Sequence, residues 1–190
     1  MPTIVAISGS LRAKSYNTML LRAVQAAAPA GTTIEIAPIR DIPLYDADVD
    51  AASGAPPSVR ALKEQISAAD GLLLATPEYN HSIPGVLKNA IDWASRPAAD
   101  IPRVFGGRVV GIVGATTGQG GTILAQAAWL PVLRALGMVP FFGGRVIVSG
   151  AAKVFDADGT VQDPAVRAQV EKYTAGFVRF VERAIMMGRI

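Results

Sequence analysis

Three short stretches of this chain combine glycine with hydrogen-bonding side chains, a composition that suits the binding of a small polar ligand. The first, residues 9–17, offers hydroxyl, amide and guanidinium donors directly after an apolar run. Gly9 permits a tight turn, and the N–H groups that open the next helix would point to the same place, supported by the helix dipole. The stretch therefore predicts a phosphate site, although it matches neither a Walker loop nor the Gly-x-Gly-x-x-Gly pattern.

In this interpretation, Ser10, Ser15 and Asn17 donate hydrogen bonds from their side chains. Arg12 adds charge and a forked donor. An alternative without a ligand remains open, in which Ser15 is only the N-cap of the helix and Arg12 is solvated. Lys14 is expected to be solvated in either case.

The second stretch, residues 77–82, follows a buried apolar run and is dense in polar side chains. Its backbone groups could pair with the ring nitrogens and carbonyls of a flat heterocycle, and Tyr79 offers an aromatic face. The alternative is that Glu78 and Asn80 satisfy the backbone of their own turn. His81 has no visible catalytic or metal-binding partner, so we expect an exposed loop histidine whose role stays open.

The third stretch, residues 115–121, is rich in glycine and also follows an apolar run. Within it, Thr116, Thr117 and Gly118 can approach a ligand ring closely, because glycine has no Cβ atom. The alternative is a plain connection between a strand and a helix.

Hydrophobic periodicity predicts five strands that alternate with five helices. The strands are residues 3–8, 33–37, a run from 72, 108–114, and a last strand made of 139–142 and 146–148. The helices are residues 16–28, 57–69, one from about 84 with Ser82 as N-cap, 123–136, and a last one opened by Asp163 and Pro164. Pro140 indicates a sheet edge, and Pro131 is expected to kink or break its helix.

This alternation is typical of an α/β protein, a five-stranded parallel sheet with helices on both faces. The flavodoxin-like order 2-1-3-4-5 makes strands 1, 3 and 4 neighbours, so the three polar stretches would meet at the carboxyl edge, where such sheets bind ligands. A mononucleotide fits this arrangement, with its phosphate on the first stretch and its ring against the other two. FMN is the natural candidate, and the length predicts a single domain over residues 1–190.

Composition excludes several other functions. Without cysteine and with one histidine, the chain cannot form a disulfide, a zinc–thiolate centre or a multi-histidine metal site. The net charge of +3 is scattered without a basic run, which argues against nucleic-acid binding. No secretory signal is visible, and no stretch approaches the roughly 20 apolar residues of a membrane span. We therefore expect a cytoplasmic protein without membrane insertion.

At its polar stretches the chain resembles the NADPH-dependent FMN reductase family, in particular its bacterial quinone and chromate reductase branch. The resemblance rests on residues 9–17, on Ile-Pro-Leu-Tyr-Asp at 42–46, and on Thr-Pro-Glu-Tyr-Asn at 76–80 with Pro-Gly-Val-Leu-Lys-Asn-Ala-Ile-Asp-Trp at 84–93. It extends over nearly the whole chain, and the signature at 76–93 is specific, whereas the third stretch varies within the family.

The resemblance implies a flavodoxin-like fold with non-covalent FMN, usually in a homodimer or homotetramer. Carried over by position, the residues that would hold the FMN phosphate are Ser10, Arg12, Ser15, Tyr16 and Asn17. Those that would line the isoalloxazine ring are Pro77, Glu78, Tyr79 and Asn80, with Thr116, Thr117 and Gly118 at its other edge. Trp93 and Trp129 are our candidates for a subunit interface.

The family takes electrons from NADPH or NADH and passes them through FMN to quinones, flavins, azo dyes or metal oxyanions such as chromate. Hydride transfer belongs to the cofactor, so no catalytic side chain is predicted, and successive use of one exposed face implies ping-pong kinetics. The rival is a flavodoxin-type electron carrier, but such carriers are usually acidic and have a threonine-rich phosphate loop. A third possibility is a relative that has lost FMN, against which the three polar stretches argue. The choice between NADPH and NADH, and the natural acceptor, remain open.

Overall fold

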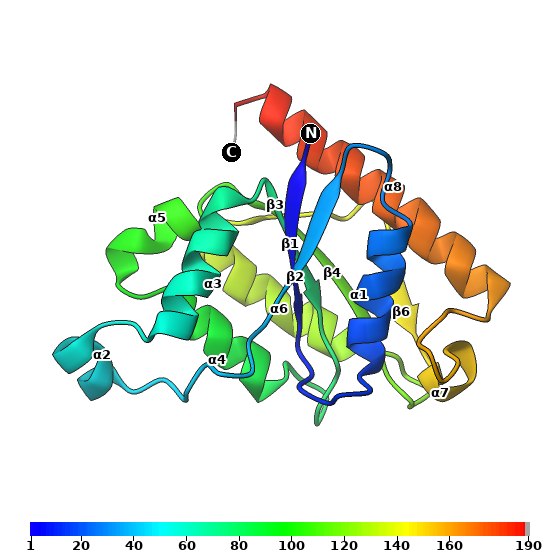
Figure 1. Ribbon diagram of the computed structural model, residues 1–190, viewed down its shortest axis with the longest axis horizontal. Helices are drawn as coiled ribbons and strands as arrows, with labels where there is room; N and C mark the ends of the chain where they lie inside the picture. The colour runs from blue at the N-terminus through cyan, green and yellow to red at the C-terminus, as the bar shows by residue number, and fades with distance from the viewer. Residues whose placement is uncertain (189–190) are drawn as a thin grey trace.

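A parallel β-sheet runs through the middle of the protein, with helices against both faces (Figure 1). The computed structural model describes residues 1–188. The first four strands are β1 (Thr3–Ser8), β2 (Thr33–Ala37), β3 (Gly71–Ala75) and β4 (Val109–Ala115). They lie in the order β2-β1-β3-β4, with Ile4 paired to Ile34 on one side and to Gly71 on the other. The predicted flavodoxin-like order and its two helical layers are confirmed.

The last strand of the prediction is wrong in one respect, because it consists of two separate strands. β5 (Val139–Pro140) pairs with the start of β4, and β6 (Val146–Val148) pairs with its end. Pro140 has no N–H to donate to a further neighbour, and the pair Gly143-Gly144 interrupts the extended chain before β6 begins. The sheet therefore has six strands, with β5 at the edge that Pro140 predicted.

Alternation along the buried strands divides the core in two. Ile4 and Ala6 of β1 contribute to the core beneath α1 (Tyr16–Ala26) and α8 (Pro164–Met186). Val5 and Ile7 point to the opposite core, which is covered by α3 (Pro57–Ala68), α4 (Gly85–Ala94) and α6 (Ile123–Ala135). Because β1, β3 and β4 are buried on both faces, their sequences are almost continuously apolar.

The segments predicted as irregular contain short helices. The long connection after β2 holds α2 (Ala47–Ser53), and the segment after α4 holds η1 (Ala98–Asp100) and α5 (Ile101–Val104). A further short helix, α7 (Ala151–Val154), follows β6. These helices are of three to seven residues, too short for a 3.6-residue periodicity to be recognised.

Helix ends test the predicted caps. The side chains of Ser15 and Asp163 accept backbone N–H groups at the starts of α1 and α8, as predicted. Ser82 is not the cap of α4: Pro84 occupies that position, and Ser82 pairs with Tyr79 instead. α6 continues through Pro131 without a break, since the buried side chains of Trp129 and Leu133 hold the helix on the sheet on either side of it.

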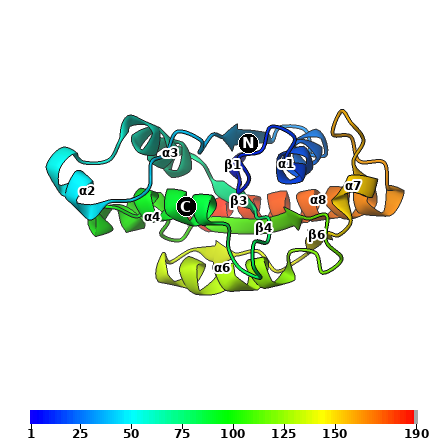
Figure 2. The same ribbon diagram turned by 90° about the horizontal axis from the view of Figure 1, so that it is seen from below.

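All parallel strands end at one edge of the sheet, at the bottom of Figure 1, and Figure 2 looks onto this edge. The loops after β1, β3 and β4 leave the sheet there, next to one another. Among the described residues, no helix combines the length and the hydropathy that crossing a bilayer requires.

Candidate functional site

Two glycines allow the three loops to approach one another at the carboxyl edge. A Cβ atom on Gly9 would lie 2.8 Å from Cδ of Pro77 and 2.9 Å from Cγ of Pro84, so the first loop packs directly on the second. A Cβ atom on Gly114 would lie 2.5 Å from the Thr76 carbonyl oxygen and would also collide with Thr122. Both approaches are closer than a side chain permits, and glycine is required at these two positions.

The loops enclose one cavity of about 110 Å³. Its lining contains ten of the twelve predicted site residues: Ser10, Arg12, Ser15, Tyr16, Asn17, Pro77, Glu78, Tyr79, Thr116 and Thr117. Asn80 and Gly118 lie outside the lining, and Ala115, which belongs to the third stretch but not to the predicted site residues, is part of it. The cavity is smaller than the roughly 300 Å³ of a complete small-molecule site, so it has room for only one end of a ligand of that size.

The start of α1 presents hydrogen-bond donors to this cavity. Ser15 caps the helix by accepting the N–H of Thr18 at 3.3 Å. Within residues 1–188, the backbone N–H groups of Tyr16 and Asn17 have no acceptor. They lie at the positive end of the helix dipole, with the exposed Arg12 beside them. This donor set fits a phosphate group.

Neighbouring residues hold the first loop in shape. The hydroxyl of Ser8 accepts a hydrogen bond from Thr18 Oγ1 at 3.0 Å, and Arg40 donates to the Leu11 carbonyl. Tyr16 stacks on Phe155, with ring centroids 5.9 Å apart. Sequence reasoning missed Ser8, Arg40 and Phe155, because their partners lie on other elements and no local pattern marks them.

Asn17 bonds to the backbone of the third loop as well as lining the cavity. Its side chain is buried, with Nδ2 donating to the Ala115 carbonyl at 2.8 Å and Oδ1 accepting the Ala115 N–H at 3.0 Å. These bonds join the first loop to the third. Asn17 therefore lines the cavity and also fixes the geometry of two of its walls.

The second loop ends in a two-residue hairpin turn. Tyr79 and Ser82 exchange backbone hydrogen bonds of 3.3 and 3.1 Å, and the residues between them, Asn80 and His81, have φ angles of 51° and 60°. Positive φ at both central positions is the mark of a type I′ turn. Tyr79 is 48% exposed and His81 lies at the tip, so the turn presents an aromatic side chain to solvent beside the cavity.

In the alternative without a ligand, the Glu78 side chain satisfies the backbone of its own turn. The structure shows it bonded elsewhere. Its Oε2 accepts the N–H groups of Leu124 and Ala125, and its Oε1 lies 3.4 Å from Nδ1 of His81. The carboxylate thus joins the second loop to the start of α6.

The third loop is tied to the segment after β6. Thr116 donates its N–H to the Val148 carbonyl at 2.9 Å, and the Gly150 N–H donates to the Gly118 carbonyl at 3.1 Å. The Gly118 N–H donates to the Thr116 hydroxyl at 3.3 Å. The loop is therefore more than a plain connection, since β6 and α7 hold it against the cavity.

Trp93 and Trp129 are not interface residues; that prediction is wrong. Both side chains are fully buried within the chain. Trp93 donates from Nε1 to the Pro43 carbonyl at 2.9 Å, and Trp129 donates from Nε1 to Thr76 Oγ1 at 3.1 Å. On amphipathic helices, tryptophans of the core and of an interface have the same spacing, so sequence alone did not separate them.

A flavodoxin-like sheet with three polar loops gathered at its carboxyl edge is typical of a class of FMN-binding proteins. Among residues 1–188, no group of three or more histidine, cysteine, aspartate or glutamate residues is arranged to hold a metal ion.

The chain belongs to the NADPH-dependent FMN reductase family, whose sequence model matches residues 2–153. The oxidoreductase class, the FMN cofactor and the NAD(P)H co-substrate predicted from the resemblance are confirmed at the level of the family.

Individual relatives match over almost the whole chain. An NAD(P)H-dependent FMN reductase of Pseudomonas aeruginosa is 44% identical over 180 residues, covering 95% of each chain. A quinone reductase of Escherichia coli is 41% identical over 186 residues, again covering 95% of each. The solved structure of FerB, a flavoenzyme NAD(P)H:acceptor oxidoreductase of Paracoccus denitrificans, has a TM-score of 0.86 at 33% identity, covering 96% of this chain and 98% of that one.

Proposed function

We propose that this enzyme takes electrons from NADPH or NADH and passes them, through FMN held at the three-loop cavity, to a small-molecule acceptor. The observation that carries the proposal is the cavity. There the backbone N–H groups of Tyr16 and Asn17, which have no acceptor within residues 1–188, lie beside the loops of residues 77–82 and 115–121. The family and the relatives support the reaction class. A quinone is the favoured acceptor, because the Escherichia coli relative is named a quinone reductase.

Each group at the cavity has a binding task. Ser10, Arg12 and Ser15, with the N–H groups of Tyr16 and Asn17, would hold the phosphate. The backbone of residues 77–80 would line the isoalloxazine ring on one side, and that of residues 116–118 would border its other edge. Bound FMN supplies the hydride and electron-transfer chemistry, and the chain orients it and leaves one side open.

Ping-pong kinetics are part of the proposal. With one end of FMN in the cavity and the rest at the surface, NAD(P)H and the acceptor would use the same open place in turn. Flavins, azo compounds and chromate-like oxyanions are the other acceptors we propose. In initial-rate measurements at several acceptor concentrations, parallel double-reciprocal lines are expected, whereas intersecting lines would show that both substrates bind together.

The first experiment is an absorption spectrum of the purified protein, with and without added FMN and then with NADPH. Flavin bands that bleach on NADPH and recover on addition of a quinone are the expected result. A protein that binds no FMN would refute the proposal. A protein that binds FMN but oxidises neither NADPH nor NADH would instead be an electron carrier of the flavodoxin type.

We further propose that the chain is one domain over residues 1–190, that it acts in the cytoplasm and that it self-associates as a homodimer or homotetramer. Apolar side chains outside the core support self-association, since Leu44 is 85% and Phe142 is 74% exposed. Light scattering coupled to size-exclusion chromatography measures the oligomeric state, and a monomeric mass would refute it.

A further inference from the structure

A carboxylate of the second loop caps a helix that begins after the third loop. Oε2 of Glu78 accepts the N–H of Leu124 at 2.9 Å and that of Ala125 at 3.0 Å. These are the second and third residues of α6, whose own N-cap residue, Thr122, makes no side-chain capping bond. Glu78 therefore does for α6 what a local N-cap residue does for most helices.

α8 provides a direct comparison. Asp163 accepts the N–H groups of Ala165 at 2.8 Å and Val166 at 3.2 Å, which are likewise the second and third residues of their helix. The geometry of the two caps is the same, but Asp163 is adjacent to its helix in sequence. Glu78 lies 46 residues before Leu124, so its cap connects two loops as well as ending a helix.

The surroundings of Glu78 make this connection firm. Its side chain is only 13% exposed, and its bond to Ala125 is partly buried, whereas the bond to Leu124 lies at the surface. Further along α6, Trp129 Nε1 donates to Thr76 Oγ1, directly before the second loop. The contacts of Thr76 and Glu78 thus hold the chain directly after β3 against α6.

We propose that Glu78 is a positioning residue, whose cap on α6 holds the second and third loops at the separation that the cofactor requires. The inference rests on the proposed function, because the positioning matters only if these loops border FMN. It differs from the ring-lining role that the family resemblance implies for this residue, since the carboxylate is turned to the helix. Gln can accept the same two N–H groups, whereas Ala cannot.

The cap itself is tested without FMN, by amide hydrogen exchange of the apo protein. The amides of Leu124 and Ala125 are expected to be protected in the wild type and in Glu78→Gln, and to lose protection in Glu78→Ala. Asp163→Ala, the matched control, should leave them protected while exposing the amides of Ala165 and Val166. Unprotected Leu124 and Ala125 amides in the wild type would overturn the proposal.

The positioning role is tested by FMN titration of the apo proteins. Glu78→Ala is expected to raise the FMN Kd about three- to tenfold, the range that loss of one cap corresponds to. Glu78→Gln should restore affinity to within about twofold. Asp163→Ala should lower the Tm about as much as Glu78→Ala does, yet leave the FMN Kd unchanged.

Two outcomes of the titration would overturn the proposal: an unchanged Kd for Glu78→Ala, or an equal loss of affinity in Glu78→Ala and Asp163→Ala, which would indicate general destabilisation. A wild type that binds no FMN would refute the proposed function. Failure of the positioning role alone looks different, because FMN binding by the wild type then remains intact.

Discussion

Asn17 and Ala115, 98 residues apart in sequence, are joined by two reciprocal hydrogen bonds at the cavity wall. The side-chain amide meets the backbone N–H and C=O of Ala115 as a neighbouring strand would. Since both residues are buried, water cannot replace either bond. The contact ties the start of α1 to the end of β4 without any ligand.

Replacing Asn17 by Ala is therefore expected to destabilise the apo protein. The change leaves a buried N–H and a buried C=O of Ala115 without partners, which corresponds to about 2–4 kcal/mol in the free energy of unfolding. Urea unfolding of the apo protein, followed by circular dichroism, measures it. If Asn17 served only the phosphate, apo stability would stay at the wild-type value and only FMN affinity would fall.

Arg12 is expected to behave in the opposite way. It is exposed at the cavity rim, so Arg12→Gln should leave apo stability unchanged and raise the FMN Kd about tenfold or more at low salt, as for a lost charge-assisted hydrogen bond. Lys14→Gln removes the same charge two residues away and is the matched control. Equal effects of the two substitutions would show that general positive charge, and not a contact from Arg12, attracts the anion.

Local chemistry and periodicity account for the parts of the fold that the sequence predicted. The apolar runs at β1, β3 and β4 identify strands buried on both faces, and their order follows from right-handed connections. Ser15 and Asp163 are caps that a sequence can reveal, because each bonds within three residues of itself. The convergence of three polar loops follows from topology alone.

What the sequence did not reveal depends on contacts across the fold. The Glu78 cap on α6 and the Asn17 bonds to Ala115 join residues far apart in the chain, and no local pattern encodes them. Burial of Trp129 is likewise decided by its position on the sheet. Pro140, Gly143 and Gly144 divide the last strand into β5 and β6, and strand propensities alone do not predict their combined effect.

The turn at residues 80 and 81 is a place where the sequence departs from the favoured chemistry. Asn-Gly is the preferred pair of a type I′ turn, and here His81 occupies the glycine position with φ of 60°. His81→Gly is expected to raise stability by about 1 kcal/mol, because glycine adopts this conformation without steric cost. Thermal unfolding measures the gain.

The same position tests whether His81 has a chemical role. His81→Ala keeps the backbone strain and removes the imidazole, so it should show no gain in stability. If His81 is the exposed loop residue that the sequence predicted, both variants retain wild-type kcat and KM for NADPH. Loss of activity in both would instead indicate that the imidazole takes part in binding or turnover.

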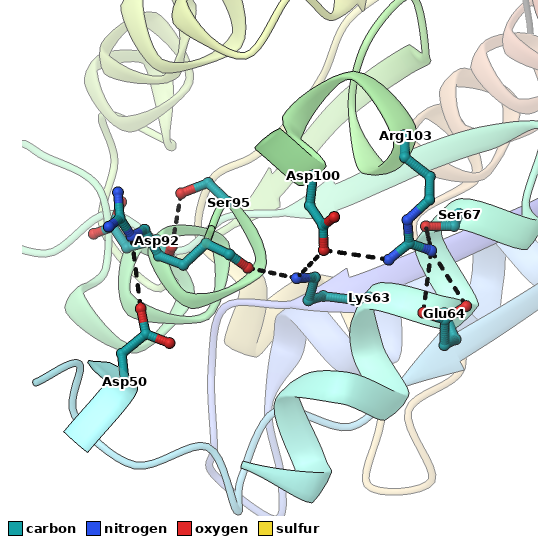
Figure 3. A network of polar contacts seen from close by, with 9 residues as sticks. Asp50, Lys63, Glu64, Ser67, Asp92, Ser95, Asp100 and Arg103 are labelled. Atoms are coloured by element: carbon teal, nitrogen blue, oxygen red, sulfur yellow. Dashed lines mark hydrogen bonds and ion pairs between the residues drawn. The ribbon is translucent and has the colours of Figure 1, made fainter. Parts of the chain in front are cut away.

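A network of charges connects α3 with the segment after α4, away from the cavity (Figure 3). Lys63, whose side chain is 6% exposed, lies 2.6 Å from the Asp100 carboxylate and also donates to the Arg96 carbonyl. Arg103 extends from α5 to Glu64 at 3.1 Å. The buried ammonium of Lys63 needs Asp100 as its counter-charge.

Asp100→Asn is expected to lower the urea midpoint at pH 7, because it leaves the Lys63 ammonium buried without an opposite charge. The hydrogen bond from Lys63 lowers the pKa of Asp100 from its ordinary value of 3.8, against the opposing effect of desolvation. Because the pKa of Asp100 is lower in the folded state than in the unfolded state, its carboxylate stabilises the fold fully above pH 3.8. This stabilisation is lost as the pH falls through the folded-state pKa. The difference in midpoint between wild type and Asp100→Asn should therefore be constant from pH 5 to 7 and shrink below pH 3.8.

Glu64→Gln, at a carboxylate whose side chain is 69% exposed, is the control and should shift the midpoint less. A difference that stayed constant down to pH 2.5 would mean that the Asp100 charge does not stabilise the fold.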